Sequence, residues 1–265
     1  MKIPTKEPKV SIIIVNYNNA KFLIKSIKSA LSQTYKFKEV IVVDDNSTDN
    51  SIKILNKFKK HITIHRNKKR TTEGSFNQIN CYYKGFLKSK GDYLFFLDSD
   101  DFYKKNKIKS IMNEFKKTNL DIIFDLPIWK YNNILIKKKF TQKKFAIFSW
   151  PRFTPQSCIS VKKKFAKELF TYLKIKKFET IWFDFRIASY TFLKNKDVYI
   201  CQKYLTYYRQ LDSSVSKKFK TFSKNWWYRR NQAHDFIMHL KIKFKIKNVI
   251  TLDRLITRII NFILL

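Results

Sequence analysis

The sequence predicts an α/β fold with a mostly parallel sheet in its first half, a mixed α+β second half and a helical C-terminal extension. Two observations support this fold class. Over residues 1–125, continuous β-branched runs alternate with segments whose apolar residues recur at helical spacing. The chain, with 265 residues and 44% hydrophobic composition, is also long and apolar enough to bury a sizeable core. This β-α-β-α order is typical of parallel sheets with right-handed crossovers.

The elements of the first half follow from these two patterns. The strands are short apolar runs of the kind that is buried on both faces of a sheet, and they are expected at residues 10–15, 40–43, 62–65, 93–97 and 121–124. The helices are expected at residues 22–31, 51–58, 75–88 and 105–117. Thr48 or Asp49 is expected to cap the second helix, and Gly91 follows the end of the third.

The alternating pattern breaks from about Leu126, where short aromatic and basic segments surround Pro127, Pro151 and Pro155. Beyond them we expect a helix at 180–193, a strand at 204–209 and helix from Phe222 to the end. The expected organisation is an α/β half at 1–125, a second half of the same domain at 126–216 and a basic, aromatic, helical C-terminal segment at 217–265.

Charge and composition limit the setting in which the protein works. The sequence holds 56 Lys and Arg against 20 Asp and Glu, a formal charge of +36, which favours a polyanionic neighbour: nucleic acid, an anionic membrane face or phosphorylated substrates. Cys81, Cys158 and Cys201 are too far apart for a disulfide framework or zinc site, which favours a reducing compartment. The polar N-terminus does not resemble a signal peptide, and no apolar run approaches the ~18 residues of a spanning helix. We expect a cytoplasmic protein, either free or lying on a membrane.

Polar side chains gather after three of the predicted strands. These segments are Asn16–Asn18, Asp44–Asp49 and Asp98–Asp101. Ligands of open parallel sheets bind beyond the carboxyl ends of the strands, so the acids are expected to share one crevice. Carboxylates that lie close together repel one another, and a bound divalent cation usually compensates their charge. Alternatively, these acids could be turn residues and helix caps with no ligand to bind. We favour this interpretation for Asp49 alone. No glycine-rich phosphate loop follows the first strand, which weighs against the common dinucleotide- and ATP-binding folds.

Three blocks resemble the signature blocks of family 2 glycosyltransferases with the GT-A fold, in the same order and at similar spacing. They are Val10–Asn18, Val42–Asp49 and Gly91–Asp101. The resemblance is strong over residues 9–125, thinner to about residue 216 and absent beyond. It implies a GT-A-type fold with a Rossmann-like N-terminal half, and an inverting transferase that takes a sugar from a nucleotide-diphosphate donor. Residues 1–125 would be the nucleotide-sugar-binding half, and residues 126–216 the half that binds the acceptor and carries the catalytic base.

The resemblance also implies roles for residues at the strand ends. Val15 and Tyr17 would flank the nucleobase, and Asp45 would bind the base or ribose. Asp98 would lie near the ribose and the metal, and Asp100 would be the direct ligand of Mg²⁺ or Mn²⁺. The remaining expected donor-site residues are Asn18, Ser99 and Arg209. A hard ion held by few carboxylates keeps positions open for two diphosphate oxygens.

Inversion by direct displacement needs a base, which in this family is the Asp of a Glu-Asp pair. The matching stretch is Glu179–Phe185, and two alignments are open. In the first, Asp184 is the base and Phe183 stands where the family has Glu. In the second, Glu179 is the only acid of the pair.

Two further expectations concern the metal and the acceptor. The segment Tyr207–Ser216 resembles a late block of the family, but Leu211 stands where a metal- or diphosphate-binding His is common, which weakens the expectation of metal dependence. Trp150, Arg152 and Gln156 are assigned to the acceptor cleft by position alone.

The C-terminal segment ends in an apolar stripe at helical spacing. Its members are Leu252, Leu255, Ile256, Ile259, Ile260 and Ile263. Together with the alternating lysines of residues 241–247, it fits either an interfacial amphipathic helix or a helix that packs on the catalytic domain.

The main hypothesis is a bacterial-type glycosyltransferase that extends a surface glycan, such as lipooligosaccharide or capsule, on a glycan or lipid-linked acceptor at the inner membrane face. The alternatives are a basic nucleic-acid-binding protein, which predicts a cationic groove, and an inactive partner subunit of the same fold.

Overall fold

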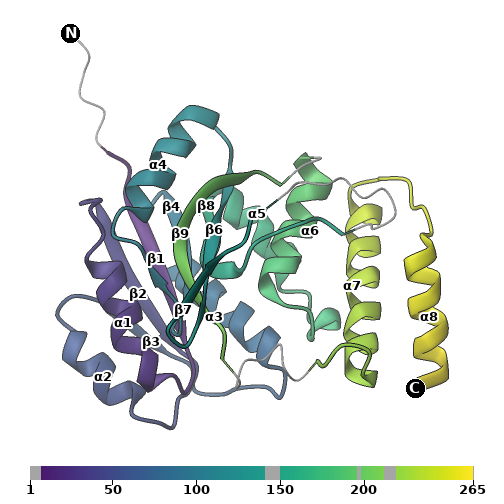
Figure 1. Ribbon diagram of the computed structural model, residues 1–265, viewed down its shortest axis with the longest axis horizontal. Helices are drawn as coiled ribbons and strands as arrows, with labels where there is room; N and C mark the ends of the chain where they lie inside the picture. The colour runs from purple at the N-terminus through teal and green to yellow at the C-terminus, as the bar shows by residue number, and fades with distance from the viewer. Residues whose placement is uncertain (1–6, 141–149, 196–197, 212–218, 265) are drawn as a thin grey trace.

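The structure of the protein, a computed structural model, describes residues 7–140, 150–195, 198–211 and 219–264 (Figure 1). The strands of these residues form one sheet in the order β3-β2-β1-β4-β8-β6-β9-β5, with β7 paired to β6. The strands are β1 (Val10–Asn16), β2 (Lys38–Asp44), β3 (Thr63–Arg66), β4 (Tyr93–Asp98), β5 (Phe102–Tyr103), β6 (Ile122–Tyr131), β7 (Ile134–Lys137), β8 (Ile159–Lys162) and β9 (Ile200–Arg209). The α-helices are α1 (Ala20–Leu31), α2 (Ser51–Phe58), α3 (Gly74–Lys88), α4 (Lys107–Thr118), α5 (Lys163–Leu173), α6 (Phe183–Asn195), α7 (Lys224–Lys243) and α8 (Leu252–Leu264), and two short 3₁₀ turns are η1 (Gln156–Cys158) and η2 (Lys176–Phe178).

The first half has the parallel order that its sequence predicts. Strand β1 pairs in parallel with β2 on one side and β4 on the other, and β2 pairs in parallel with β3. All seven residues of β1 are buried, as expected of a strand covered on both faces. Helix α3 packs close to β1 at Gly85, where a Cβ atom would lie 2.3 Å from Cγ2 of Ile13. The parallel pairing brings the carboxyl ends of β1, β2 and β4 to one edge.

The second half is mixed, as the sequence predicts, but its first strand is longer than expected. Strand β6 continues through Pro127 to Tyr131 and pairs with β8 antiparallel and β9 parallel. The strand expected to end at Phe124 therefore continues to Tyr131. Proline cannot donate a ladder hydrogen bond, and the pairing of β6 with β9 shifts register on both sides of Leu126. That irregularity accommodates Pro127 within the strand.

The C-terminal segment is helical but not continuous, which corrects the expectation of one helix from Phe222 onward. Helix α7 ends at Lys243 and α8 begins at Leu252. The two helices lie side by side at the edge of the molecule remote from α1 and α2 (Figure 1). Within the described residues, no helix is both long and apolar enough to cross a membrane.

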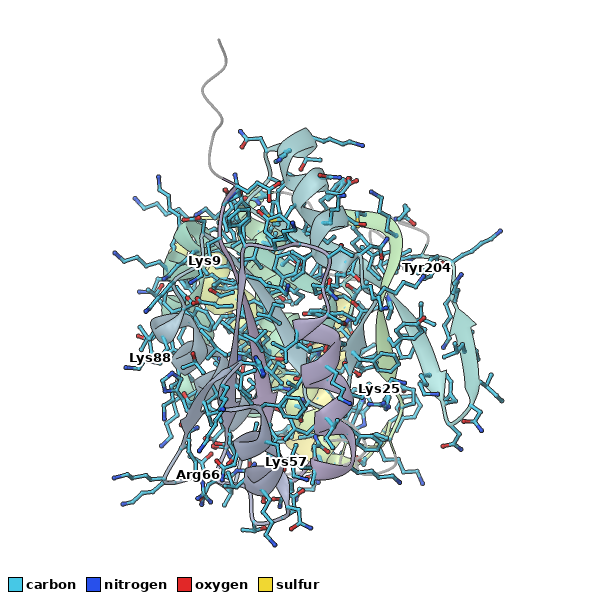
Figure 2. All side chains as sticks on the ribbon, turned by 90° about the vertical axis from the view of Figure 1, so that its left-hand side faces the viewer. Lys9, Lys25, Lys57, Arg66, Lys88 and Tyr204 are labelled. Atoms are coloured by element: carbon cyan, nitrogen blue, oxygen red, sulfur yellow. The ribbon has the colours of Figure 1, made fainter. Side chains whose placement is uncertain are left out.

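Basic side chains cover the surface widely. Figure 2 shows Lys9, Lys25, Lys57 and Lys88 at separate places on the face that carries α1 and α2. On this face the labelled cations lie apart from one another, as on a generally basic surface. In contrast, the carboxylates gather at the strand ends.

Candidate active site

Three carboxylates meet where β4 ends. One ligand oxygen from each of Asp98, Asp100 and Asp101 lies within 4.8 Å of the others. Asp98 is the last residue of β4, and the backbone N–H of Asp101 donates to the Asp98 carbonyl at 3.1 Å, which closes the turn. Asp98 and Asp100 are half-buried, whereas Asp101 is buried. These three residues are called the aspartate cluster below.

Asp98 is fixed by three side-chain donors. The Gln78 amide and the Tyr82 hydroxyl donate to Oδ1 at 2.9 Å and 2.7 Å, and the Gln156 amide donates to Oδ2. Gln78 and Tyr82 come from α3, and Gln156 comes from the turn η1. Helix α3 and η1 therefore orient the carboxylate from two sides. Gln156, expected at the acceptor cleft, lies at the aspartate cluster.

Asp101 is the member of the cluster to which the sequence interpretation gave no role. The Ser157 hydroxyl donates to Oδ2 at 2.6 Å, and the Arg209 backbone N–H donates to Oδ1 at 2.8 Å. The Arg209 guanidinium donates to the carbonyl of Asp100. Asp101 thus ties the end of β9 to the turn after β4, and it brings the expected phosphate-countering Arg209 to the cluster. A role for Asp101 could have been predicted from the sequence, because Asp101 is the last residue of the third signature block.

Burial dominates the electrostatics of the cluster. It raises the pKa of Asp98, and it raises the pKa of Asp100 to about 7, with the neighbouring charge of Asp98 as the second cause. Burial and the charges of Asp100 and Asp98 raise the pKa of Asp101 well above its ordinary value. The three carboxylates are short of compensating positive charge. Since carboxylate oxygens are the preferred ligands of hard divalent cations, the donor set fits Mg²⁺ or Mn²⁺.

A second polar group lies where β1 and β2 end. Asp45 is buried, accepts a hydrogen bond from the Asn67 amide at 2.9 Å and pairs with Nε of Arg70 at 2.8 Å. The Arg70 guanidinium lies 3.1 Å from the ring centroid of Tyr17, a side chain that is 43% exposed. An aromatic face beside an acid and a guanidinium can hold a flat polar ring by stacking and hydrogen bonds. Sequence reasoning missed Arg70, because it lies outside the signature blocks in a basic stretch.

Three other expected donor-site residues shape the loops around this group. Val15 is buried in β1. Asn18 has a positive φ of 49°, and its side-chain oxygen accepts from the Thr48 backbone N–H at 2.8 Å. Ser99 is buried and accepts from the Asn19 amide at 3.1 Å. The hydrogen bonds of Asn18 and Ser99 hold the strand-end loops together.

Asp49 joins two helix starts. Its Oδ2 accepts from the backbone N–H of Ala20 at 2.9 Å, and its Oδ1 accepts from that of Ser51 at 2.9 Å. These are the first residues of α1 and α2, whose N–H groups have no partner within their helices. A capping role for Asp49 agrees with the interpretation favoured from the sequence.

Asp184 lies in the first turn of α6 and is buried. Its Oδ1 accepts the Phe185 backbone N–H at 2.9 Å. Burial raises the pKa of Asp184 to about 7, and the charge of Asp98 also raises it. The preceding Phe183 stacks on Tyr82 with ring centroids 4.5 Å apart, and Tyr82 donates to Asp98. Phe183, which stands at the family's Glu position in the first of the two alignments, is therefore a core side chain packed against Tyr82.

Glu179, the other candidate base, is half-buried at the end of η2. The electrostatic neighbours of Asp184 include Asp98, whereas no interaction recorded for the described residues connects Glu179 to the aspartate cluster. This electrostatic effect of Asp98 on the pKa of Asp184 favours Asp184 over Glu179 as the candidate base.

Helix α7 reaches this region through Arg229, which sequence reasoning did not single out. Its Nε donates to the Thr180 carbonyl at 2.7 Å, and its Nη2 donates to the Ser75 hydroxyl at 3.1 Å. The Arg229 charge counters the burial effect on the pKa of Asp184. The guanidinium also lies 4.2 Å from the ring centroid of Trp182. The C-terminal segment thus supports the second half of the site.

The other positions expected at the acceptor cleft or metal differ in their settings. Trp150 is half-buried and packs against Phe185 and His234 at centroid distances of 5.0 Å and 5.3 Å. Arg152 is exposed, and Leu211 is half-buried after the end of β9. Residues 212–216 of the late block, like residues 141–149 of the irregular segment, lie outside the described residues.

Comparisons with known proteins identify the family. Residues 11–184 match glycosyl transferase family 2, a stretch that runs from β1 to Asp184 and covers more than half of the chain. The chain belongs to this family. Relatives include the UDP-Glc:α-D-GlcNAc-diphosphoundecaprenol β-1,3-glucosyltransferase WfaP of Escherichia coli, which is 38% identical over 133 residues, or 49% of this chain and 48% of that protein. The poly(ribitol-phosphate) β-N-acetylglucosaminyltransferase TarP of Staphylococcus aureus is 34% identical over 119 residues, or 43% of this chain and 35% of that protein. These matches span less than half of either relative.

Solved structures agree on the fold of this family member. S. aureus TarS in complex with UDP-GlcNAc has a TM-score of 0.64 at 15% identity, over 87% of this chain and 66% of that chain. The mannosyltransferase PcManGT of Pyrobaculum calidifontis in complex with GDP-Man and Mn²⁺ has a TM-score of 0.57 at 14% identity, over 98% of this chain and 70% of that chain. The mixed α/β fold is that of GT-A glycosyltransferases, as the sequence resemblance implied.

Proposed function

We propose that this glycosyltransferase moves a sugar from a nucleotide-diphosphate donor, a UDP-sugar, to a glycan or lipid-linked glycan acceptor with inversion. The observation that carries this proposal is the aspartate cluster at the carboxyl end of β4. The charge of Asp98 also raises the pKa of the buried Asp184. A site that gathers carboxylates without paired cations is suited to a cationic cofactor and a phosphate-bearing ligand. The UDP and UDP-GlcNAc complexes of TarS support the choice of donor.

The nucleoside end of the donor is assigned to the group at the ends of β1 and β2. Tyr17 and Arg70 offer a stacking face, and Asp45 offers carboxylate acceptors for base N–H or ribose O–H groups. Before a donor enters, the Arg70 guanidinium lies over the Tyr17 ring, so we expect it to move aside when the base binds. Residues 1–125 would then form the donor half of the site.

The diphosphate end is assigned to the aspartate cluster and Arg209. Asp100 and Asp98 would hold Mg²⁺ or Mn²⁺, and the ion would neutralise charge that develops on the departing nucleotide. Arg209, held against Asp100 and Asp101 by its own hydrogen bonds, faces the same region with a second positive charge. Leu211 is apolar, and among residues 207–211, the described part of this late segment, Arg209 is the cation.

The chemical step assigned to Asp184 is proton abstraction from the acceptor hydroxyl. As that oxygen attacks the anomeric carbon, the bond from this carbon to the diphosphate oxygen breaks, and one displacement inverts the configuration. The proton goes to a carboxylate oxygen of Asp184. A pKa near 7 keeps this carboxylate basic enough to accept a proton and still substantially ionised near neutral pH.

The acceptor is assigned to a bacterial surface glycan or its lipid-linked precursor. WfaP is named for transfer to a diphosphoundecaprenol-linked sugar, and TarP for transfer to poly(ribitol-phosphate). The second half of the domain, residues 126–216, would bind the acceptor, and Gln156 beside Asp98 is one of its contacts with the donor half. Work on a lipid-linked acceptor would bring a cytoplasmic protein to the inner membrane face.

Asp184→Asn tests the assignment of the base. We expect the variant to bind UDP with Mn²⁺ as the wild type does and to lose sugar transfer by about 100-fold or more, since general bases contribute about 10²–10⁴-fold. Transfer is measured with a panel of UDP-sugars and an undecaprenyl-diphosphate glycan. Glu179→Gln is the matched control and should retain transfer. Normal turnover by Asp184→Asn with loss in Glu179→Gln would move the base to Glu179.

A further inference from the structure

Helix α8 packs on the protein with its polar face and exposes its apolar face. Arg254, Thr257 and Asn261, spaced by three and four residues, are buried on one side of the helix. The opposite side consists of large apolar residues that are exposed: Leu252, Leu255, Ile256, Ile259, Phe262 and Ile263, called the apolar face of α8 below. An amphipathic helix that only packs on its own domain buries its apolar stripe, so this orientation needs another cause.

The polar contacts between α7 and α8 are specific. The Asn261 amide donates to the Trp227 carbonyl at 2.9 Å, and the Arg230 guanidinium donates to Oγ1 of Thr257 at 3.2 Å and to the Asp253 carboxylate. Arg254 is buried and lies 3.8 Å from Asp235 of α7. These bonds fix the rotation of α8 about its axis, so the apolar face points away from the protein. Phe262, at 90% exposed, projects furthest from any packing partner.

Cations flank the apolar face. Between Lys241 and Leu264 the sequence has six Lys and Arg residues and one acid, Asp253. Lys243 is the last residue of α7, and Lys245 and Lys247 lie in the stretch between α7 and α8. All three lysines are exposed, as are the neighbouring Ile242 and Ile246. Exposed aliphatic side chains with a cationic border match the chemistry of a lipid surface with anionic headgroups. A partner protein with an apolar groove would not require the surrounding positive charge.

We propose that α8 is an interfacial helix, which lies in the plane of an anionic membrane with its apolar face in the acyl region and the preceding lysines at the headgroups. No described helix can span a bilayer, so attachment of this part of the chain would be peripheral. Figure 1 shows α8 as the outermost layer of its edge, with α7 between it and the rest of the molecule. A membrane along this edge would leave the sheet and its strand ends free to bind a donor from water.

Vesicle binding tests the apolar face. The full chain is mixed with phosphatidylcholine vesicles that contain no phosphatidylglycerol or about one-third of it, and the partition coefficient is measured by sedimentation. We expect Ile259→Ser/Ile263→Ser to bind anionic vesicles at least about tenfold more weakly than the wild type, because each buried CH₂ contributes to membrane affinity. Phe37→Ser/Leu87→Ser, which changes two similarly exposed apolar residues on other elements, should bind as the wild type does.

Lysine replacement tests the charge. Lys243→Gln/Lys245→Gln/Lys247→Gln should weaken binding to anionic vesicles by about fivefold for each lysine at low salt. Lys57→Gln/Lys59→Gln/Lys60→Gln carries the same change in net charge on the opposite edge and should bind nearly as the wild type. Equal losses in both triple variants would mean that overall charge, and not this surface, drives binding. Absence of lipid binding, with a concentration-dependent dimer that Ile259→Ser/Ile263→Ser dissociates, would assign the face to a second copy instead and overturn the proposal.

Discussion

Asp100 is half-buried beside the carboxylates of Asp98 and Asp101, and its pKa is raised to about 7, first by burial and then by the charge of Asp98. In the unfolded chain the same group titrates near 3.8. The folded protein therefore holds its Asp100 proton more tightly than the unfolded chain. The stabilisation that this proton provides is complete below the unfolded pKa and is lost as the pH rises through the folded pKa.

Without divalent cations, we expect Asp100 to make the protein less stable at pH 8 than at pH 6 by about 1 kcal/mol. This corresponds to about 2–4 °C in Tm for a chain of this size. Asp100→Asn should lack this part of the pH dependence and melt higher than the wild type at pH 8. Thermal melts at the two pH values measure it. Identical pH dependence in both proteins would contradict a raised pKa at Asp100.

Three of the residues that the sequence predicted at the site, Asp45, Asp98 and Asp100, lie at strand ends within the signature blocks. Strand ends in a parallel sheet fall at one edge, so Asp45, Asp98 and Asp100 could be placed together from pattern alone. Arg70 and Arg229 could not, because each reaches the site from a segment whose path depends on tertiary packing. Arg229 comes from α7, beyond the part of the chain that resembles the family.

At the scale of elements, a buried polar network joins the framework behind the aspartate cluster. Lys107, the first residue of α4, is fully buried, and its ammonium lies 2.5 Å from Asp125 of β6. The same ammonium donates to the Ser157 carbonyl at 2.7 Å and to the Thr206 hydroxyl of β9 at 2.6 Å. Ser157 in turn donates to Asp101. Four elements thereby hold the turn that carries the cluster.

Lys107→Met should destabilise the protein by about 3–5 kcal/mol, because it leaves the Asp125 carboxylate buried without its cation. Lys107→Met/Asp125→Leu removes both charges and should recover most of that loss. Chemical denaturation of the two variants and the wild type measures the free energies of unfolding. If the double variant were as unstable as the single one, packing at Lys107 rather than charge pairing would be the cause.

Two element-scale expectations failed for identifiable reasons. A proline inside an apolar run favours an early strand end, but the register shifts between β6 and β9 allow β6 to continue through Pro127. Apolar spacing also predicted one helix from Phe222 onward, although the exposed stretch between α7 and α8 interrupts it. The apolar stripe of α8 was recognised, whereas its outward direction depends on polar contacts with α7 that spacing does not reveal.

For the whole molecule, the net charge of +36 and the local clustering of acids act at different ranges. Surface cations raise the concentration of phosphate-bearing ligands near the protein. This attraction becomes weaker as the salt concentration increases. In the proposed function, the aspartate cluster acts over a few ångströms and would determine where a cation and a diphosphate bind. Family membership and fold followed from the blocks at the strand ends, and the total charge identified neither.

Donor binding by isothermal titration tests the central claim most directly. UDP is titrated into wild-type protein and Asp100→Ala, each with and without Mn²⁺, and Asp121→Ala serves as the control because Asp121 is an exposed acid at the start of β6. We expect wild type and Asp121→Ala to bind UDP more tightly with Mn²⁺, and Asp100→Ala to lose about tenfold or more of that gain, since the lost ligand is a direct carboxylate contact of the ion. Equal UDP affinity in all three proteins with Mn²⁺, or no binding by any, would contradict a donor site at the aspartate cluster.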